Sequence, residues 1–288
     1  MPRGRAESFR SKRTITLRLT RKLAFAATAA AALCLGTVIP AAANSVPDAD
    51  DIPTFQEFEA STYRDFDGAY VVNGDEVISD QEELRSFYEQ LLGADPVTNG
   101  LVVNTVNSVD DKWSDALVST LTYCVSTAFG ARHADVVDAM AGGAALWEAA
   151  SSKIDFIYDS SADANCTTRN EAVLFSVEPV QTTQYIARAF FPSTAPRLQN
   201  VLIDDSIWTP GSSWTPTNVI GHELGHVLGF RHEHTRPEAG TCFEDTNWRP
   251  LTPYDSSSIM HYPQCNGSSD DLSMTSVDTA GVVALYGN

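Results

Sequence analysis

The stretch His222-Glu223-Leu224-Gly225-His226-Val227-Leu228-Gly229-Phe230-Arg231-His232 decides the fold. On a helix, residues four apart share a face, so His222 and His226 present two imidazoles to one ion. Gly229 can adopt a positive φ, which lets the helix end and the chain swing His232 round as a third ligand. Three neutral nitrogens leave the fourth tetrahedral position open to water, which is the pattern of a catalytic rather than a structural zinc site.

Glu223 leaves the same helix beside the two histidines, which places its carboxylate next to the attacking water rather than on the metal. The stretch therefore predicts one catalytic Zn²⁺ with Glu223 as general base and then general acid. The alternative is a buried amphipathic helix with incidental histidines. Half of the six histidines of the chain lie in this one motif, which favours their role as ligands.

A second motif, Ser258-Ile259-Met260-His261-Tyr262, follows downstream. Together the two motifs resemble the metzincin clan of zinc peptidases, which place a methionine-containing turn beneath the metal. Within the clan, the chain resembles astacin-like enzymes, where a glutamate (here Glu233) follows the third histidine and the turn reads S-x-M-H-Y. Residues 215–265 are also similar to secreted bacterial peptidases of the dual-action HEIGH type.

This resemblance implies roles for further residues. Met260 would form an apolar floor beneath the ligands without binding the ion, and a plain core methionine would look the same in sequence. Tyr262, a neutral donor just beyond the turn, is the candidate for stabilising the oxyanion, with a packed aromatic ring as the alternative. In astacin-like enzymes the matching tyrosine can also ligate zinc at rest, and Glu233 would contact the new N-terminus after a pro-region is removed.

Asp75 is a candidate latch for the metal site. In Val72-Asn73-Gly74-Asp75 the chain resembles the F-x-G-D motif of astacin-like pro-regions, with valine in place of phenylalanine. The aspartate of that motif occupies the open zinc position, where an anionic oxygen blocks catalysis. The alternative is ordinary hairpin chemistry, because Asn-Gly-Asp is also a common turn sequence.

The first 43 residues are predicted to be a signal peptide for secretion. An apolar run over residues 23–40 follows a basic pair, and three alanines precede Asn44 as a small-residue cleavage site. An uncleaved membrane anchor is the alternative. Removal takes away eight of the 19 basic residues and one of the 37 acidic residues, so the exported chain carries a formal charge of −25. Such an anion repels nucleic acid and anionic membranes, and no later segment is apolar enough to span a bilayer.

Four cysteines remain after the signal peptide: Cys124, Cys166, Cys242 and Cys265. An even count in a secreted chain predicts two disulfides, with three possible connectivities. We favour Cys124–Cys166 and Cys242–Cys265, because the second pair would brace the segment that leads to the methionine turn. The alternative, a second zinc held by cysteines, has no C-x-x-C spacing to support it.

Residues 44–110 are predicted to form a small pro-region in front of a catalytic domain over residues 111–288. Within this region, residues 70–78 are typical of a hairpin with an Asn-Gly turn. Ser79 and Glu82 are predicted to form a capping box for the helix that follows. A permanent accessory subdomain is the alternative to a pro-region.

The elements expected after residue 110 are a strand over residues 117–125, a helix over residues 134–150, short strands, the zinc helix and a loop-rich tail. The short strands are expected over residues 154–158, 173–177, 186–191 and 200–203. This order matches the plan implied by the resemblance, an α+β metzincin-type fold with a twisted mixed sheet, two long helices and an irregular C-terminal part. Residues 185–191 are expected to form the edge strand above the cleft, where a substrate peptide could add as a further strand. Packing of Phe190 or Phe191 into the core is equally compatible with this pattern.

Together these features predict a secreted zinc endopeptidase that acts on protein or peptide substrates and is expected to be monomeric. The alternative is a zinc-bearing peptide-binding or adhesion protein without turnover. The presence of Glu223 argues against that alternative, because binding alone needs no base. The acidic pairs Glu244-Asp245 and Asp270-Asp271 lack the spacing of a calcium loop, so the sequence leaves a calcium requirement open.

Overall fold

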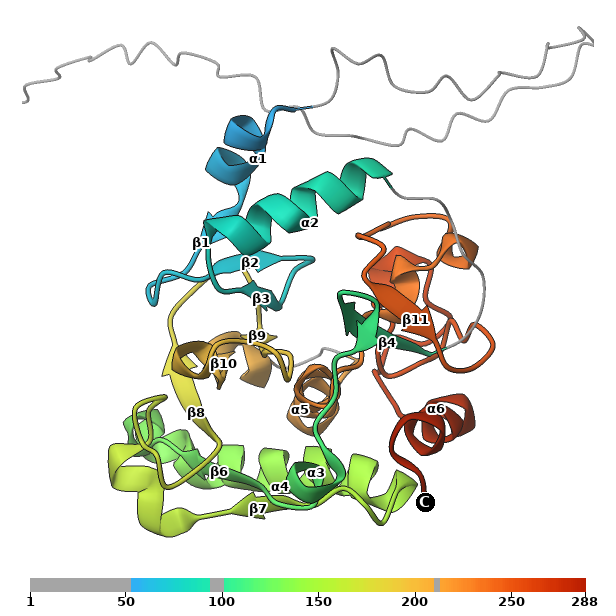
Figure 1. Cartoon of the computed structure of the whole chain (residues 1–288). Helices are drawn as coiled ribbons and strands as arrows, with labels where there is room; N and C mark the ends of the chain where they lie inside the picture. The colour runs from blue at the N-terminus through green and yellow to red at the C-terminus, as the bar shows by residue number, and fades with distance from the viewer. Residues whose placement is uncertain (1–52, 94–100, 210–212) are drawn as a thin grey trace, which may run out of the picture. The chain divides into compact units, whose positions relative to one another are not determined.

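The computed structural model describes residues 53–93, 101–209 and 213–288 (Figure 1). The described residues all belong to one compact unit. The expected signal peptide, residues 1–43, lies outside the described residues. In the described part of the chain, no helix combines the length and the apolar character needed to cross a membrane.

A five-stranded mixed sheet forms the framework, with the strand order β7-β6-β8-β10-β9. Its strands are β6 (Leu121–Val125), β7 (Phe156–Tyr158), β8 (Phe175–Val180), β9 (Ala187–Arg188) and β10 (Asn200–Asp204). The first four strands in the sheet order run parallel, whereas β9 runs antiparallel to β10. The strand expected over residues 185–191 is therefore the sheet edge, as predicted, although only two of its residues pair.

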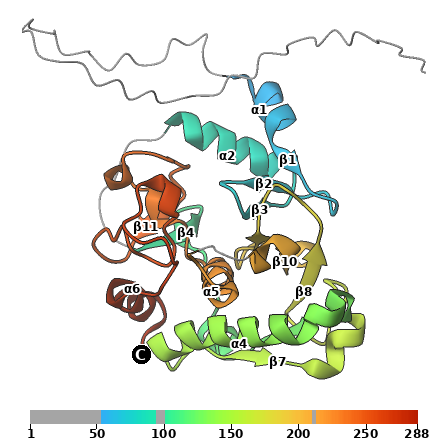
Figure 2. The same cartoon turned by 180° about the vertical axis from the view of Figure 1, so that it is seen from behind.

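Two helices, α4 (His133–Ala150) and α5 (Pro216–Val227), pack side by side and share the main apolar core with the sheet (Figures 1 and 2). The indole of Trp147 on α4 donates a hydrogen bond to the carbonyl of Gly221 on α5 at 2.8 Å. This bond satisfies a polar group inside the core and fixes the position of α5 along α4. The helix expected over residues 134–150 is confirmed.

Residues 53–93, hereafter the N-terminal segment, form a small fold with its own apolar core. Its elements are α1 (Phe55–Ser61), β1 (Tyr63–Arg64), β2 (Tyr70–Val72), β3 (Glu76–Ile78) and α2 (Gln81–Gly93). The predicted hairpin is confirmed: β2 pairs with β3, and Asn73 and Gly74 between them both have positive φ. Positive φ at two turn residues matches the right-handed twist of the strands, which is why Asn-Gly favours this turn.

The capping box predicted for α2 is wrong. The side chain of Asp80 caps the helix instead, because its carboxylate accepts the N–H groups of Glu82 and Glu83 at 2.9 and 3.0 Å. The backbone N–H of Ser79 donates to the Glu83 carboxylate. Ser79 and Asp80 are neighbours and are both residue types that favour the N-cap position, and the charged Asp80 takes it.

A third group of strands ties residues 101–110 to the chain that follows α5. β4 (Val102–Val106) pairs with β5 (Val109–Asp110) and with β11 (Trp248–Pro250). Val103 also forms a β-bridge with Phe230, which lies within the zinc motif. The last part of the expected pro-region, residues 101–110, is therefore built into the sheet beside the motif rather than into the N-terminal segment.

Two further expectations need correction. The first two residues of the expected strand 117–125 belong instead to the short helix α3 (Asp115–Val118), which Ser114 caps, and the strand begins only at Leu121. The tail expected to be loop-rich contains α6 (Ser276–Tyr286), whose first turn is held by a capping box between Thr275 and Asp278.

Both favoured disulfides are present. Cys124–Cys166 joins β6 to the chain before β8, and Cys242–Cys265 joins the two sides of the segment that contains the methionine turn. This pairing excludes the alternative of a second zinc held by these four cysteines.

Candidate metal centre and catalytic cleft

Helix α5 presents the two motif histidines from one face. At its start, the Thr215 hydroxyl accepts the N–H of Asn218 at 3.2 Å, and Pro216 lies in the first turn. His222 and His226 follow one turn apart, and both are buried. The position of these side chains therefore follows directly from the helical repeat.

Two residues after the end of α5 at Val227, Gly229 turns the chain. This residue has φ +95°, and a Cβ atom at this position would lie 2.1 Å from the carbonyl oxygen of Asp111. Only glycine fits here, because both the positive φ and the close approach of the backbone exclude a side chain. The chain turns at this point and brings the buried His232 back towards the pair on α5.

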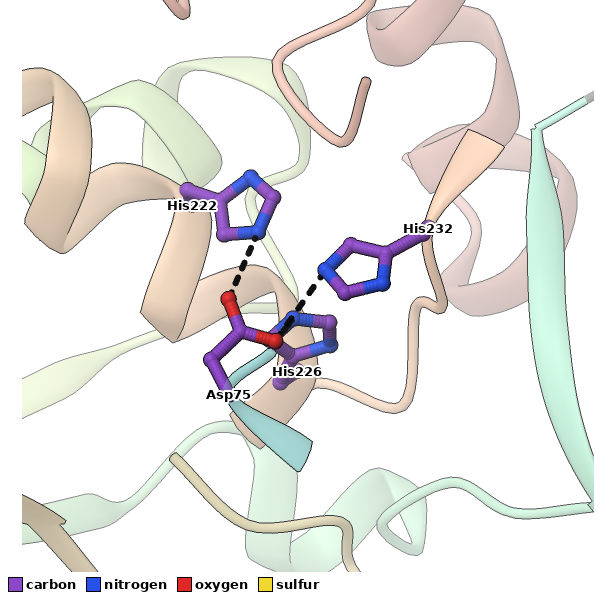
Figure 3. A group of neighbouring side chains, drawn as sticks. All are labelled: Asp75, His222, His226 and His232. Carbon is purple, nitrogen blue, oxygen red and sulfur yellow. Dashed lines mark ion pairs between the residues drawn. The ribbon is translucent and has the colours of Figure 1, made fainter. Parts of the chain in front are cut away.

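The three imidazoles converge on Asp75 (Figure 3). In each ring the Nδ1 atom has a hydrogen-bond partner: the carbonyl of Ile259 at 2.7 Å for His222, the carbonyl of Phe230 at 2.8 Å for His226, and the Glu244 carboxylate at 2.7 Å for His232. These partners hold the proton on Nδ1 and turn each Nε2 lone pair inward. Such partners of the second ring nitrogen are usual for histidines that ligate metals.

The inward-facing atoms fit a zinc ion. The three Nε2 atoms and Asp75 Oδ1 are buried and have no hydrogen-bond partner. The Asp75 oxygens lie 3.4, 3.5 and 3.1 Å from the Nε2 atoms of His222, His226 and His232. Ligands placed about 2.0–2.1 Å from one tetrahedral zinc lie about 3.3–3.4 Å from each other. Three imidazoles and a carboxylate are also donors that zinc prefers.

Glu223 lies beside this cluster and takes no part in it. Its side chain is buried, and its Oε2 atom has no hydrogen-bond partner. Burial raises the pKa of Glu223 well above its ordinary value, and the nearby Asp75 carboxylate raises it further. A cavity of about 240 Å³ is lined by Glu223 together with Asp75, His222 and Tyr262. The carboxylate therefore faces the space in which a substrate would meet the histidines.

Tyr262 contacts the cluster directly, whereas Met260 packs against α5. The Tyr262 hydroxyl donates a hydrogen bond to the Asp75 carboxylate, and its ring stacks on His222 with centroids 5.4 Å apart. Met260 is fully buried, and a Cβ on Gly225 would lie 2.3 Å from its sulfur. The methionine thus fills the space beneath α5, whereas the tyrosine reaches the oxygen that faces the histidines.

Asp75 comes to the cluster from the turn between β2 and β3. Its backbone carbonyl accepts the N–H of Ala189, just beyond the edge strand β9, at 3.3 Å. Burial alone would raise the pKa of Asp75, but the facing imidazoles of His232 and His226 hold it well below its ordinary value. The aspartate is therefore an anion in the position that the sequence analysis assigned to the latch.

Glu233 is buried rather than solvent-exposed. One carboxylate oxygen accepts from Arg236 at 2.9 Å and from the N–H of Asp255 at 3.0 Å, whereas the other oxygen has no hydrogen-bond partner. Burial raises the pKa of Glu233 to about 8. The structure thus leaves one oxygen of this carboxylate available to a further donor.

Sequence reasoning missed the role of Glu244 and Asp245, which it considered only as an acidic pair. Glu244 holds His232 and lies 3.2 Å from Nε2 of His234, and Asp245 pairs with Arg231 at 2.6 Å. Both carboxylates are buried. The contact between Glu244 and His232 spans 12 residues of irregular chain, so no periodic pattern could have indicated it.

Comparisons with known proteins find partial similarity to zinc metalloproteases. No family model matches the sequence. High choriolytic enzyme 2 from Oryzias latipes is 38% identical over 16% of this chain and 22% of its own length. Zinc metalloproteinase nas-39 from Caenorhabditis elegans is 37% identical over 18% of this chain and 8% of its own length. Astacin-like metalloprotease toxin 2 from Loxosceles intermedia is 36% identical over 20% of this chain and 30% of its own length.

Each of these matches spans less than a third of the relative's length. Among solved structures, High choriolytic enzyme 1, a hatching enzyme zinc-protease from Oryzias latipes (Medaka fish), aligns with a TM-score of 0.38 and 20% sequence identity over 60% of this chain and 96% of that chain. The sequence matches show a distant and partial homology to astacin-like zinc metalloproteases.

Proposed function

We propose that this chain is a secreted zinc endopeptidase, made with an N-terminal segment that occupies its catalytic centre. The single observation that carries the proposal is the set of three buried Nε2 atoms that face one point without a hydrogen-bond partner, with Glu223 beside them. The homology to zinc metalloproteases supports the same reaction class. Two disulfides support an extracellular location, because such bonds persist in oxidising compartments.

His222, His226 and His232 would hold the ion, and the oxygens bonded to their Nδ1 atoms keep the rings oriented. Bound zinc would supply Lewis-acid polarisation of the scissile carbonyl and a water of lowered pKa. Glu223 takes a proton from the attacking water and gives it to the departing amine. Once Asp75 has left, the Tyr262 hydroxyl is free to donate to the developing oxyanion.

In the unprocessed chain, Asp75 acts as the latch. Its carboxylate lies among the three imidazoles, where it would fill the fourth ligand position of a bound zinc. It also accepts the Tyr262 hydroxyl, so this donor is not available to an oxyanion. Activation then requires removal of the N-terminal segment. The removed part ends before Leu101, because β4 stays paired with β11 and bridges Phe230. The free Glu233 oxygen would receive the new N-terminus.

The similarity of residues 215–265 to dual-action HEIGH-type peptidases is a finer part of this proposal, and it rests on those residues alone. A zinc-bearing peptide-binding protein without turnover remains the second candidate. Glu223 distinguishes the two, since a buried carboxylate without a partner serves proton transfer and adds nothing to zinc binding.

The test combines zinc content with cleavage of an unstructured protein such as casein. Secreted wild type and Glu223→Ala are compared before and after limited proteolysis of the N-terminal segment, with and without a zinc chelator. The proposal expects one zinc per chain and chelator-sensitive cleavage that appears on proteolysis and is lost in the variant. Zinc without cleavage after processing would favour the binding protein, and absence of zinc would overturn both candidates.

A further inference from the structure

Arg188, on the edge strand β9, is fully buried but is neutralised by carboxylates of the N-terminal segment. Its Nε donates to Asp65 at 2.8 Å and its Nη2 to Asp67 at 2.5 Å. Among described residues outside that segment, Arg188 forms no ion pair, and its Nη1 donates only to the neutral side chain of Asn200, at 3.2 Å. Removal of the segment would therefore leave this guanidinium without an ion-pair partner among the described residues, although its charge still acts on the Glu223 carboxylate.

Arg231 provides the contrast within the same chain. It also receives a carboxylate from the N-terminal segment, Glu76 at 3.0 Å. However, it keeps Glu244 at 3.3 Å and Asp245 at 2.6 Å, both from the loop that follows the zinc motif. After processing, Arg231 stays paired, whereas Arg188 does not. An unpaired charge in a largely buried position is costly, so Arg188 would take up either water or another anion.

Tyr185 completes the site around the Asp65 carboxylate. Its hydroxyl donates to the same carboxylate group that Arg188 binds. Tyr185 is itself buried and belongs to the part of the chain that remains after processing. The two side chains thus form a cradle with one cationic and one neutral donor, which is a geometry suited to a carboxylate.

This cradle borders the catalytic cleft. Tyr185 and Ala187 line the same cavity as Glu223. On the other side of Arg188, the N–H of Ala189 donates to the carbonyl of Asp75. Because β9 is the sheet edge, an extended peptide that takes the place of Asp75 would run along this edge and pass Arg188.

We propose that Arg188 and Tyr185 form a substrate subsite for the carboxylate of an aspartate or glutamate side chain near the scissile bond, and that Asp65 and Asp67 fill this subsite before processing. The inference rests on the proposed peptidase function. It gives the enzyme a preference for acidic peptides, which the zinc motif alone does not specify.

The experiment digests a peptide library of randomised sequence with the full-length protein after limited proteolysis, and mass spectrometry locates the cleaved bonds. Wild type is expected to enrich Asp and Glu at one position within four residues of the cleaved bond. In Arg188→Gln that enrichment should fall by about tenfold or more, while cleavage of peptides with Asn or Gln at the same position persists. Arg188→Lys should retain part of the preference, because the charge remains without the forked geometry.

Two companion variants keep the test decisive. Arg188→Gln combined with Asp65→Asn and Asp67→Asn lets the unprocessed chain fold without unpaired carboxylates, and processing yields the same mature sequence as the single variant. Arg249→Gln removes an arginine whose side chain is half exposed and pairs with Asp110, and it should leave the preference unchanged. Cleavage without acidic enrichment in wild type, or enrichment that survives in Arg188→Gln, would overturn the inference alone. Absence of any zinc-dependent cleavage would overturn the proposed function and this inference with it.

Discussion

The metal centre and its contact with the N-terminal segment both contain buried charged groups, but these charges are paired in different ways. In the metal centre, His232 and Arg231 find their carboxylates, Glu244 and Asp245, in the loop that directly follows the motif. Between the segment and the rest of the chain, the segment supplies the acid each time and the other side supplies an arginine or an imidazole.

If the N-terminal segment is removed as proposed, this difference separates the ion pairs that would remain from those that would be lost. Pairs made within the catalytic part, such as His232 with Glu244, would survive the proposed removal, so the histidines would keep their orientation. Pairs made across the boundary would be lost together, which would uncover Arg188, Tyr262 and the space that Asp75 fills among the three imidazoles. The N-terminal segment thus contributes acids that pair with cationic groups and imidazoles of the cleft. His232 and Arg231 also have partners in the loop that follows the motif.

The largest effect should come from the base itself. In the processed protein, Glu223→Ala should lower casein cleavage about 10²- to 10⁴-fold, because the proton has no acceptor, while zinc content stays unchanged. Glu171→Ala, which removes an exposed glutamate, serves as the matched control. Loss of zinc in Glu223→Ala would contradict a centre that holds the metal with its histidines alone.

The next effect concerns the bond that braces the centre. Replacing both Cys242 and Cys265 by alanine should reduce the free energy of unfolding by about 3 kcal/mol, because the loop they close spans 23 residues of sequence. Chemical denaturation of the unprocessed and processed protein measures this change. An equal loss of unfolding free energy in both forms would support a centre that is stabilised within the catalytic part. A loss seen only in the unprocessed form would contradict it.

Substitution of Glu244 tests whether the metal centre is held by contacts within the catalytic part alone. Glu244→Gln should weaken zinc binding about 10- to 100-fold, because the carboxylate that orients His232 becomes a neutral amide. Competition with a zinc chelator measures the affinity before and after proteolysis. A loss seen only while the N-terminal segment is present would mean that the segment, and not Glu244, holds the third ligand.

The smallest effect should come from the latch. In the unprocessed chain, Asp75→Asn should raise casein cleavage about tenfold or more, as expected when about 1.4 kcal/mol of inhibitory contact is lost. Glu82→Gln changes an exposed acid of the same segment and should leave the unprocessed chain inactive. Unchanged inactivity in Asp75→Asn would show that the ionic contacts of Asp65, Asp67 and Glu76 suffice to hold the segment.

Sequence predicted the parts of the site that are encoded locally. The spacing of His222 and His226 follows the helical repeat, and the turn at Gly229 and the hairpin before Asp75 depend on positive φ. The contact of Arg188 with Asp65 spans 123 residues, and no periodicity or turn signal connects the two. The helix α6 was missed even though its capping box stands in the sequence, because a loop-rich tail was expected there.

The most direct test of the separation between centre and cover is a crystal structure of the zinc-loaded, full-length chain with anomalous diffraction at the zinc edge. We predict one peak about 2.0–2.2 Å from the Nε2 atoms of His222, His226 and His232 and from an Asp75 oxygen. Crystals of the processed protein should keep the peak on the three histidines without Asp75. A peak held elsewhere, for example at His234 and Glu244, or a peak that disappears on processing, would contradict the account.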